Sequence, residues 1–158
     1  MTEYPMFRAG EVLDMAVQIE EQGLAFYESC AQASLGSETT EVFEYLIDQE
    51  KNHVKIFTRM KQGLDDFPLP ESYPGETRSY IESFVKDRVF SSPEDAAHIS
   101  EPREAVALAI GFEQRSILFY SAMKDAARQS EGGVIDRVIA QEHEHIRRLV
   151  KLQRDLGF

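Results

Sequence analysis

The chain contains 158 residues, of which 42% are hydrophobic and 28% charged, and its formal net charge is −11. A chain of this length buries roughly two thirds of its unfolded surface in one core, and the composition excludes disordered, collagen-like and disulfide-scaffold proteins. The negative charge disfavours nucleic acid and anionic membrane surfaces as partners, and leaves metal ions and cationic partners open.

Cysteine content and hydropathy indicate the compartment. The single cysteine, Cys30, cannot form an internal disulfide or a cysteine-rich metal site, and it suits a reducing environment. The N-terminal residues 1–14 are too polar for a signal peptide, and no run approaches the roughly 20 apolar residues of a spanning helix. We therefore expect a cytoplasmic protein without membrane attachment.

Four segments carry apolar residues at helical spacing. They cover approximately residues 9–33, 38–62, 102–128 and 134–155. Ser37 is the predicted N-cap of the second helix, and Pro102 is a favoured first-turn residue for the third. Gly132 and Gly133 are expected to separate the third and fourth helices. Short loops within each pair predict two antiparallel helical hairpins.

A proline- and glycine-rich crossover of about 40 residues connects the hairpins. Within it, apolar residues from Tyr80 to Val89 predict a short amphipathic helix, and residues 92–95 resemble a cap that opens one more turn. Two hairpins joined in this way predict one all-α domain over residues 1–158, a four-helix bundle whose long crossover contains a short helix.

The two hairpins are copies of one design. The segment IEEQGLAFYESCA, from Ile19, aligns with FEQRSILFYSAMK, from Phe112, at an offset of 93 residues. At an offset of 92 residues, QEKNHVKIF from Gln49 aligns with QEHEHIRRL from Gln141, so that a Glu-x-x-His pair recurs. A lone Glu-x-x-His is a weak signal, but here both copies follow an aligned helix at nearly the same interval.

The repeat places six polar residues on otherwise apolar helix faces. They are Glu20, Glu50, His53, Glu113, Glu142 and His145. Four carboxylates in an apolar core must be protonated, paired with cations or bound to metal, and no Lys or Arg interrupts these stripes near the helix centres. Two divalent ions carry four positive charges and would balance the four carboxylates, with two neutral imidazoles as further donors. The charge arithmetic therefore favours a dinuclear site.

One Glu from each of two helices and Glu-x-x-His from each of two others is the ligand pattern of ferritin-like di-iron or di-manganese proteins. Through these motifs the whole chain resembles the rubrerythrin branch of the ferritin-like superfamily. The resemblance implies that Glu50 and Glu142 bridge two iron ions, with manganese or zinc as substitutes. The other ligands that it implies are His53, His145, Glu20 and Glu113.

Two tyrosines lie on the first and third helices, each at the same interval after the glutamate of its helix. Tyr27 and Tyr120 come seven residues after Glu20 and Glu113. By the resemblance, they are hydrogen-bond donors to the ligand carboxylates. The alternative is that both are ordinary core aromatics.

The chain also departs from typical rubrerythrins. It lacks the paired Cys-x-x-Cys motifs of their rubredoxin-like module, so electrons are expected from a separate donor protein. Where those proteins carry an extra glutamate one turn after the third-helix ligand, this sequence has Ser116, and Gly23 occupies the matching position in the first hairpin. These small residues either leave room for dioxygen or peroxide or are packing notches.

The leading interpretation is a non-haem di-iron oxidoreductase that reduces hydrogen peroxide or dioxygen with electrons from an external donor. One alternative is a ferroxidase or iron-handling protein, in which iron is the substrate. Another is a metal-stabilised helical oligomerisation module without catalysis. We expect a homodimer, because twofold association is the commonest form of homo-oligomer.

Overall fold

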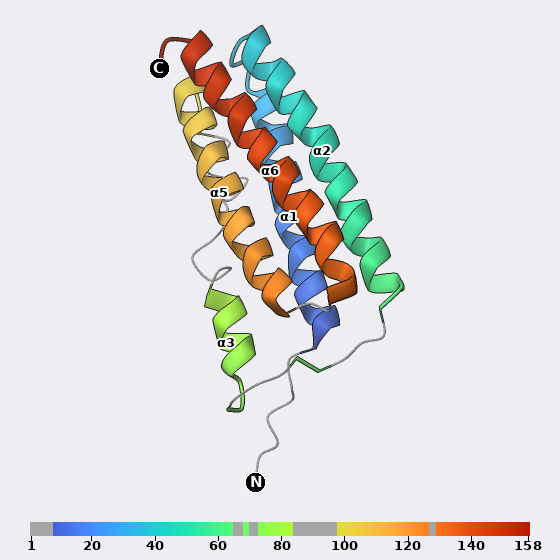
Figure 1. The fold of residues 1–158 in the computed structure, drawn as a ribbon. Coiled ribbons are helices and arrows are strands. Elements are labelled where there is room, and N and C mark those ends of the chain that lie inside the picture. Colours follow the sequence, from blue (N-terminus) through green and yellow to red (C-terminus); the bar gives the residue numbers. More distant parts are fainter. Residues whose placement is uncertain (1–7, 65–67, 70–72, 84–97, 127–128) are drawn as a thin grey trace.

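The computed structural model describes residues 8–64, 68–69, 73–83, 98–126 and 129–158. Four long helices lie side by side along one axis (Figure 1). They are α1 (Ala9–Gln32), α2 (Ser37–Gln62), α5 (Pro102–Ala126) and α6 (Gln129–Asp155). The shorter α3 (Glu76–Ser83) lies near one end of the bundle and contacts α5. The predicted all-α bundle of two hairpins, with a long crossover that contains a short helix, is confirmed.

Packing between the helices follows the repeat. Helix α1 packs along α2 and α5 packs along α6, which gives the two hairpins. The hairpins meet where α2 contacts α6 and α1 contacts α5. This arrangement brings the two Glu-x-x-His helices together on one side of the bundle axis and the two Glu-x6-Tyr helices together on the other. The interior between these four helices is where the site forms.

The turn between α1 and α2 differs from the prediction at its cap. Ser37 is the first residue of α2, and the N-cap is Gly36, which makes no side-chain capping bond. Gly36 has φ of 97°, a left-handed conformation that glycine adopts without a steric cost. The tight turn therefore needs glycine at the position where a capping serine would otherwise be favoured.

The start of α6 also differs from the prediction. Gly132 and Gly133 lie inside α6, which begins at Gln129, and do not separate it from α5. Interior glycines cost a helix about 1 kcal/mol each relative to alanine, so contacts with α5 must compensate. A Cβ at Gly132 would lie 3.9 Å from Lys124 Cε, and the Lys124 ammonium pairs with Asp136 of α6 at 2.6 Å. The helix therefore continues through a sequence that predicts a break.

The crossover helix is partly visible in the described residues. Helix α3 covers the start of the segment predicted from Tyr80 to Val89, and residues 84–89 lie outside the described residues, as does the predicted cap at 92–95. Within α3, Ile81 is fully buried against its own chain. No helix among the described residues is long and apolar enough to cross a membrane.

Candidate metal centre

The middle of the bundle holds a wholly buried polar cluster. Helices α1 and α5 each contribute one glutamate, while α2 and α6 each contribute a glutamate and a histidine three residues later. These residues are Glu20, Glu50, His53, Glu113, Glu142 and His145, and each has 0% exposure. Residues three apart share a helix face, so each Glu-x-x-His pair presents both side chains inward. The structure therefore brings together all six predicted ligands, although their binding of metal stays a prediction.

The six side chains form two overlapping groups of four. One group is Glu20, Glu50, His53 and Glu142, and the other is Glu50, Glu113, Glu142 and His145. In each group, one potential ligand atom from every residue lies within 4.8 Å of the others. Glu50 and Glu142 belong to both groups. The two carboxylates are therefore placed to bridge two neighbouring ions.

Both histidines turn Nδ1 toward the carboxylates. His53 Nδ1 lies 2.9 Å from Glu142 Oε1 and 3.5 Å from Glu20 Oε2. His145 Nδ1 lies 3.4 Å from Glu113 Oε2 and 3.6 Å from Glu142 Oε1. Adjacent donor atoms bound at roughly 2.1 Å to one ion lie about 3 Å apart. The distances therefore fit sets of donors that could close around ions with little movement.

Several atoms of the cluster have no hydrogen-bond partner among the described residues. They include both oxygens of Glu50, Oε2 of Glu142 and Oε2 of Glu20. Unpaired charges in a protein interior carry a large desolvation penalty, and natural structures rarely leave them without a counter-charge. Oxygen-rich donor sets with imidazole suit iron or manganese, and also accept zinc. The residues thus fit a pair of divalent ions.

The carboxyl groups of the cluster differ in the direction in which their surroundings shift the pKa. Burial, and then repulsion from Glu20 and Glu142, raises the pKa of Glu50 well above its ordinary value. Burial, followed by repulsion from Glu113 and Glu20, also raises the pKa of Glu142 well above its ordinary value. Burial acts to raise the pKa of Glu20 as well, but contacts with Glu50 and His53 outweigh it, and the net shift is downward. Without a bound cation, burial and mutual repulsion therefore favour the protonated form of Glu50 and of Glu142.

Both predicted tyrosines bond to carboxylates, and each does so across the hairpin boundary. Tyr27 of α1 donates its hydroxyl to Glu113 Oε1 of α5 at 2.6 Å. Tyr120 of α5 donates its hydroxyl to Glu20 Oε1 of α1 in a short hydrogen bond. Burial raises the pKa of both tyrosines well above the ordinary value, and the carboxylates beside them add to the shift. Each hydroxyl therefore keeps its proton and orients a carboxylate.

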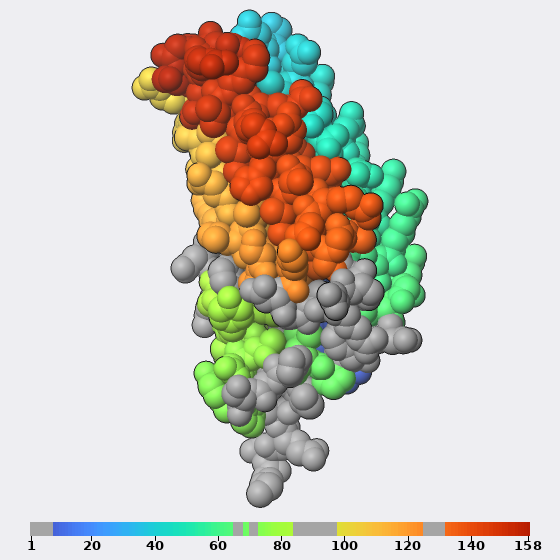
Figure 2. Space-filling view, viewed as in Figure 1, coloured from blue at the N-terminus to red at the C-terminus, as the bar shows by residue number. Residues whose placement is uncertain are grey.

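Aromatic rings cover the cluster on both sides along the bundle axis. Phe43 and Phe57 lie seven residues before and after Glu50, which places them roughly 10 Å away in opposite directions along α2. The Phe43 ring lies 5.6 Å from that of Tyr27, and the Phe57 ring lies 5.1 Å from that of Tyr120. On the face drawn in Figure 2, the side chains of α6 lie between those of α5 and those of α2. The packing keeps bulk water from the six polar residues.

Ser116 and Gly23 are both buried on the helix faces that carry Glu113 and Glu20. The Ser116 hydroxyl has no hydrogen-bond partner among the described residues. The Ser116 hydroxyl is therefore an unused donor on the same helix face as Glu113 and Tyr120. A serine side chain cannot take the place of a carboxylate ligand.

Sequence reasoning missed one residue next to the cluster. Gln141 of α6 is half-buried, and its Oε1 lies 2.7 Å from Nε2 of His53 on α2. The available signal was the repeat itself, which carries glutamine immediately before the glutamate in both Glu-x-x-His copies, at Gln49 and Gln141. Periodicity alone gave no reason to choose between the two glutamines.

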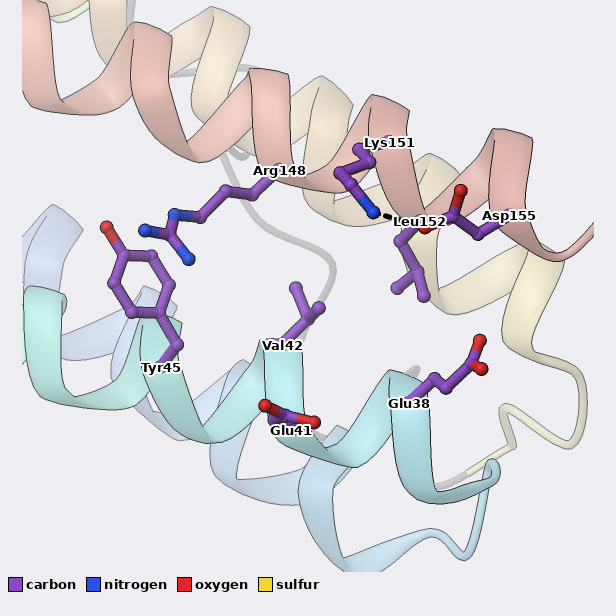
Figure 3. Close-up of a pocket in the computed structure, with 8 residues that line it drawn as sticks. All are labelled: Glu38, Glu41, Val42, Tyr45, Arg148, Lys151, Leu152 and Asp155. Carbon is purple, nitrogen blue, oxygen red and sulfur yellow. Dashed lines mark hydrogen bonds and ion pairs between the residues drawn. The ribbon is translucent and has the colours of Figure 1, made fainter.

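A surface pocket of about 440 Å³ lies outside the cluster, between α2 and α6. Figure 3 shows Tyr45 and Arg148 pointing toward one another across it, and the Arg148 guanidinium lies 3.9 Å from the centre of the Tyr45 ring. The Tyr45 ring also meets the His145 ring edge-on at 6.0 Å. Tyr45 therefore separates this pocket from the buried cluster.

Comparison with known proteins agrees with this geometry. A family model described as rubrerythrin matches residues 11–89. The crystal structure of a protein from Thermotoga maritima, described as ferritin-like and diiron-carboxylate, superposes with a TM-score of 0.72 at 23% sequence identity. The match covers 94% of this chain and 96% of that one, and shows that the two share a fold. Among curated protein sequences none matches the chain. Since the family model spans half of the sequence, including Glu20, Glu50 and His53, the chain belongs to the rubrerythrin family.

Proposed function

We propose that this protein is a non-haem di-iron oxidoreductase that reduces hydrogen peroxide or dioxygen with electrons from an external donor. The observation that carries the proposal is the pair of buried four-residue groups that share Glu50 and Glu142. When bound, a pair of ferrous ions supplies the two electrons that convert hydrogen peroxide and two protons into two molecules of water.

The chain itself contributes binding, orientation and exclusion of water. Glu50 and Glu142 would be shared by the two ions, because each belongs to both groups. Tyr27 and Tyr120 fix the carboxylates of the opposite hairpin, so that the donor set is preorganised before any ligand arrives. The low-dielectric surroundings strengthen every charge interaction within the site.

Ferroxidase activity is the second candidate, and the net charge of −11 favours it. An acidic surface raises the local concentration of cations and steers them inward. In that reaction ferrous iron is the substrate and is released after oxidation, whereas in the leading proposal the two ions stay bound. Counting the iron retained after several turnovers distinguishes these two functions.

The proposal includes a separate electron-donor protein and a homodimer in the cytoplasm. Tyr45 contacts His145 and also lines the surface pocket, so a donor on the α2/α6 face would come near the cluster. Apolar surface remains for a second copy of the chain, since Leu118 of α5 is 56% exposed and Val150 of α6 is 48% exposed. Light scattering at micromolar concentration should give twice the chain mass, and a monomer alone would contradict the dimer.

The decisive experiment begins with metal analysis of protein purified from iron-replete cells. We expect two iron ions per chain, and rapid oxidation of the anaerobically reduced protein by peroxide or by dioxygen in single-turnover mixing. Glu142→Ala should lose the metal pair with helix content intact, whereas Glu21→Ala, at an exposed position beside Glu20, should keep it. A Glu142→Ala variant that binds two equivalents as tightly as the parent would overturn the proposal.

A further inference from the structure

The two histidines of the cluster are not equivalent. Both face the carboxylates through Nδ1, but their outer nitrogens differ. Nε2 of His53 lies 2.7 Å from Gln141 Oε1, whereas Nε2 of His145 is buried without a hydrogen-bond partner among the described residues. This difference breaks the twofold pattern that the sequence repeat imposes on the ligands.

The bond to Gln141 determines which nitrogen of His53 carries the proton. An amide oxygen only accepts hydrogen bonds, so Nε2 of His53 must donate and therefore holds the proton. The lone pair of a neutral His53 is then on Nδ1, the atom that lies 2.9 Å from Glu142 Oε1. A hydrogen bond of this kind fixes both the tautomer and the ring orientation of a histidine that binds metal.

Gln49 provides an internal comparison. It occupies the position of Gln141 in the other hairpin, one residue before Glu50. If the repeat were fully symmetric, Gln49 would bond to His145, yet Nε2 of His145 has no such partner. Both glutamines are half-buried, so the two differ in their hydrogen bond to a cluster histidine and not in how exposed they are.

We propose that Gln141 is a positioning residue that presets His53 for metal, and that the group Glu20, Glu50, His53 and Glu142 therefore binds the first ion. The group that contains His145 binds the second ion more weakly, because no hydrogen bond at the outer nitrogen of its imidazole fixes the tautomer. The proposal rests on the metal-binding part of the proposed function. It goes beyond that function by assigning an order of loading to the two positions.

Stepwise titration of the metal-free protein with cobalt(II) tests the role of Gln141. Gln141→Leu should weaken the tighter step by about 10- to 100-fold, the usual range when such a partner is lost. Gln49→Leu should change neither step by more than about twofold. Gln141→Glu, which keeps an acceptor oxygen, should restore the tighter step, and Gln49→Glu controls for the added charge. Repulsion between ions separates the two steps in any dinuclear site, so the comparison among variants carries the test.

Histidine NMR on zinc-loaded protein identifies the position that is affected. With one equivalent of zinc(II), the His53 signals should move while those of His145 stay near their metal-free values. The Nε2 proton of His53 should exchange slowly in the parent and in Gln49→Leu, and rapidly in Gln141→Leu. A general loss of packing would not single out this proton.

The outcomes separate the inference from the proposed function. A parent that binds neither cobalt nor zinc would overturn the metal centre and the inference with it. If the parent binds two ions but Gln49→Leu weakens binding as much as Gln141→Leu does, only the inference fails. First loading at His145 would overturn it in the same way.

Discussion

Replacing Glu50 by glutamine should stabilise the metal-free protein at neutral pH, although it removes one of the two carboxylates that both four-residue groups share. Both oxygens of Glu50 are buried without hydrogen-bond partners, and burial with repulsion from its neighbours raises its pKa well above the ordinary value. A carboxyl group of this kind stabilises the fold below its unfolded pKa of about 4.3, and this contribution is lost as pH rises toward the folded pKa. Glutamine keeps the shape of the side chain and does not titrate.

The size of the stabilisation depends on how far the pH of the measurement lies above the pKa of Glu50 in the unfolded chain. Each pH unit above the unfolded pKa costs the parent up to about 1.4 kcal/mol until the folded pKa is reached. The advantage of Glu50→Gln in the free energy of unfolding should therefore grow between pH 5 and pH 7, by at most about 1.4 kcal/mol per pH unit. Urea unfolding followed by far-UV circular dichroism, after removal of metal with a chelator, measures it directly.

Two other glutamates provide controls. Replacing the first should change the stability in the opposite direction, and replacing the second should leave it nearly unchanged. The pKa of Glu20 is lowered on balance, so its charged form stabilises the fold above its unfolded pKa and this contribution is lost as pH falls. Glu20→Gln should therefore destabilise the metal-free protein at pH 7, and the exposed Glu21→Gln should stay within about 0.5 kcal/mol of the parent. A Glu50→Gln variant no more stable than the parent at pH 7, or an advantage that does not grow between pH 5 and pH 7, would refute the reasoning.

Three further predictions concern residues around the cluster. Tyr27→Phe leaves Glu113 Oε1 without its donor and should cost about 1–3 kcal/mol of metal-free stability in urea unfolding; an unchanged midpoint would show that the bond is replaced. Ser116→Glu adds a carboxylate one turn after Glu113 and should change the ratio of peroxide to dioxygen oxidation rates in single-turnover mixing, whereas an unchanged ratio would place selectivity elsewhere. Burial raises the pKa of the Cys30 thiol to about 12, so native protein should resist Ellman's reagent at pH 8 and urea-unfolded protein should react, while fast labelling of the native state would contradict the burial.

The bundle and the composition of its centre could be predicted from the amino-acid sequence alone. Helical spacing and the 92–93-residue repeat were sufficient to predict four long helices in two hairpins and to bring Glu20 and Glu113 toward the two Glu-x-x-His pairs. Such predictions succeed because helical periodicity is local, and because a charged residue on an apolar stripe has no other direction in which to point.

Local signals were less reliable where packing between helices competes with them. The pair Gly132 and Gly133 predicts a break, yet α6 continues through both glycines beside Lys124 of α5. Helix propensity describes a single helix and leaves out its contacts with the neighbouring helix, and these contacts can override it.

The pairing of side chains within the centre became visible in the three-dimensional structure and could not be predicted from the sequence. The sequence places Tyr27 two turns after Glu20 on its own helix, but the structure pairs it with Glu113 of the opposite hairpin. It likewise gives Gln141 and Gln49 the same position in the repeat, and only Gln141 bonds to a cluster histidine. Such pairings depend on the relative rotation and axial shift of helices that belong to different hairpins. Sequence periodicity does not encode these two quantities, because they are set by how all the side chains of the core pack together.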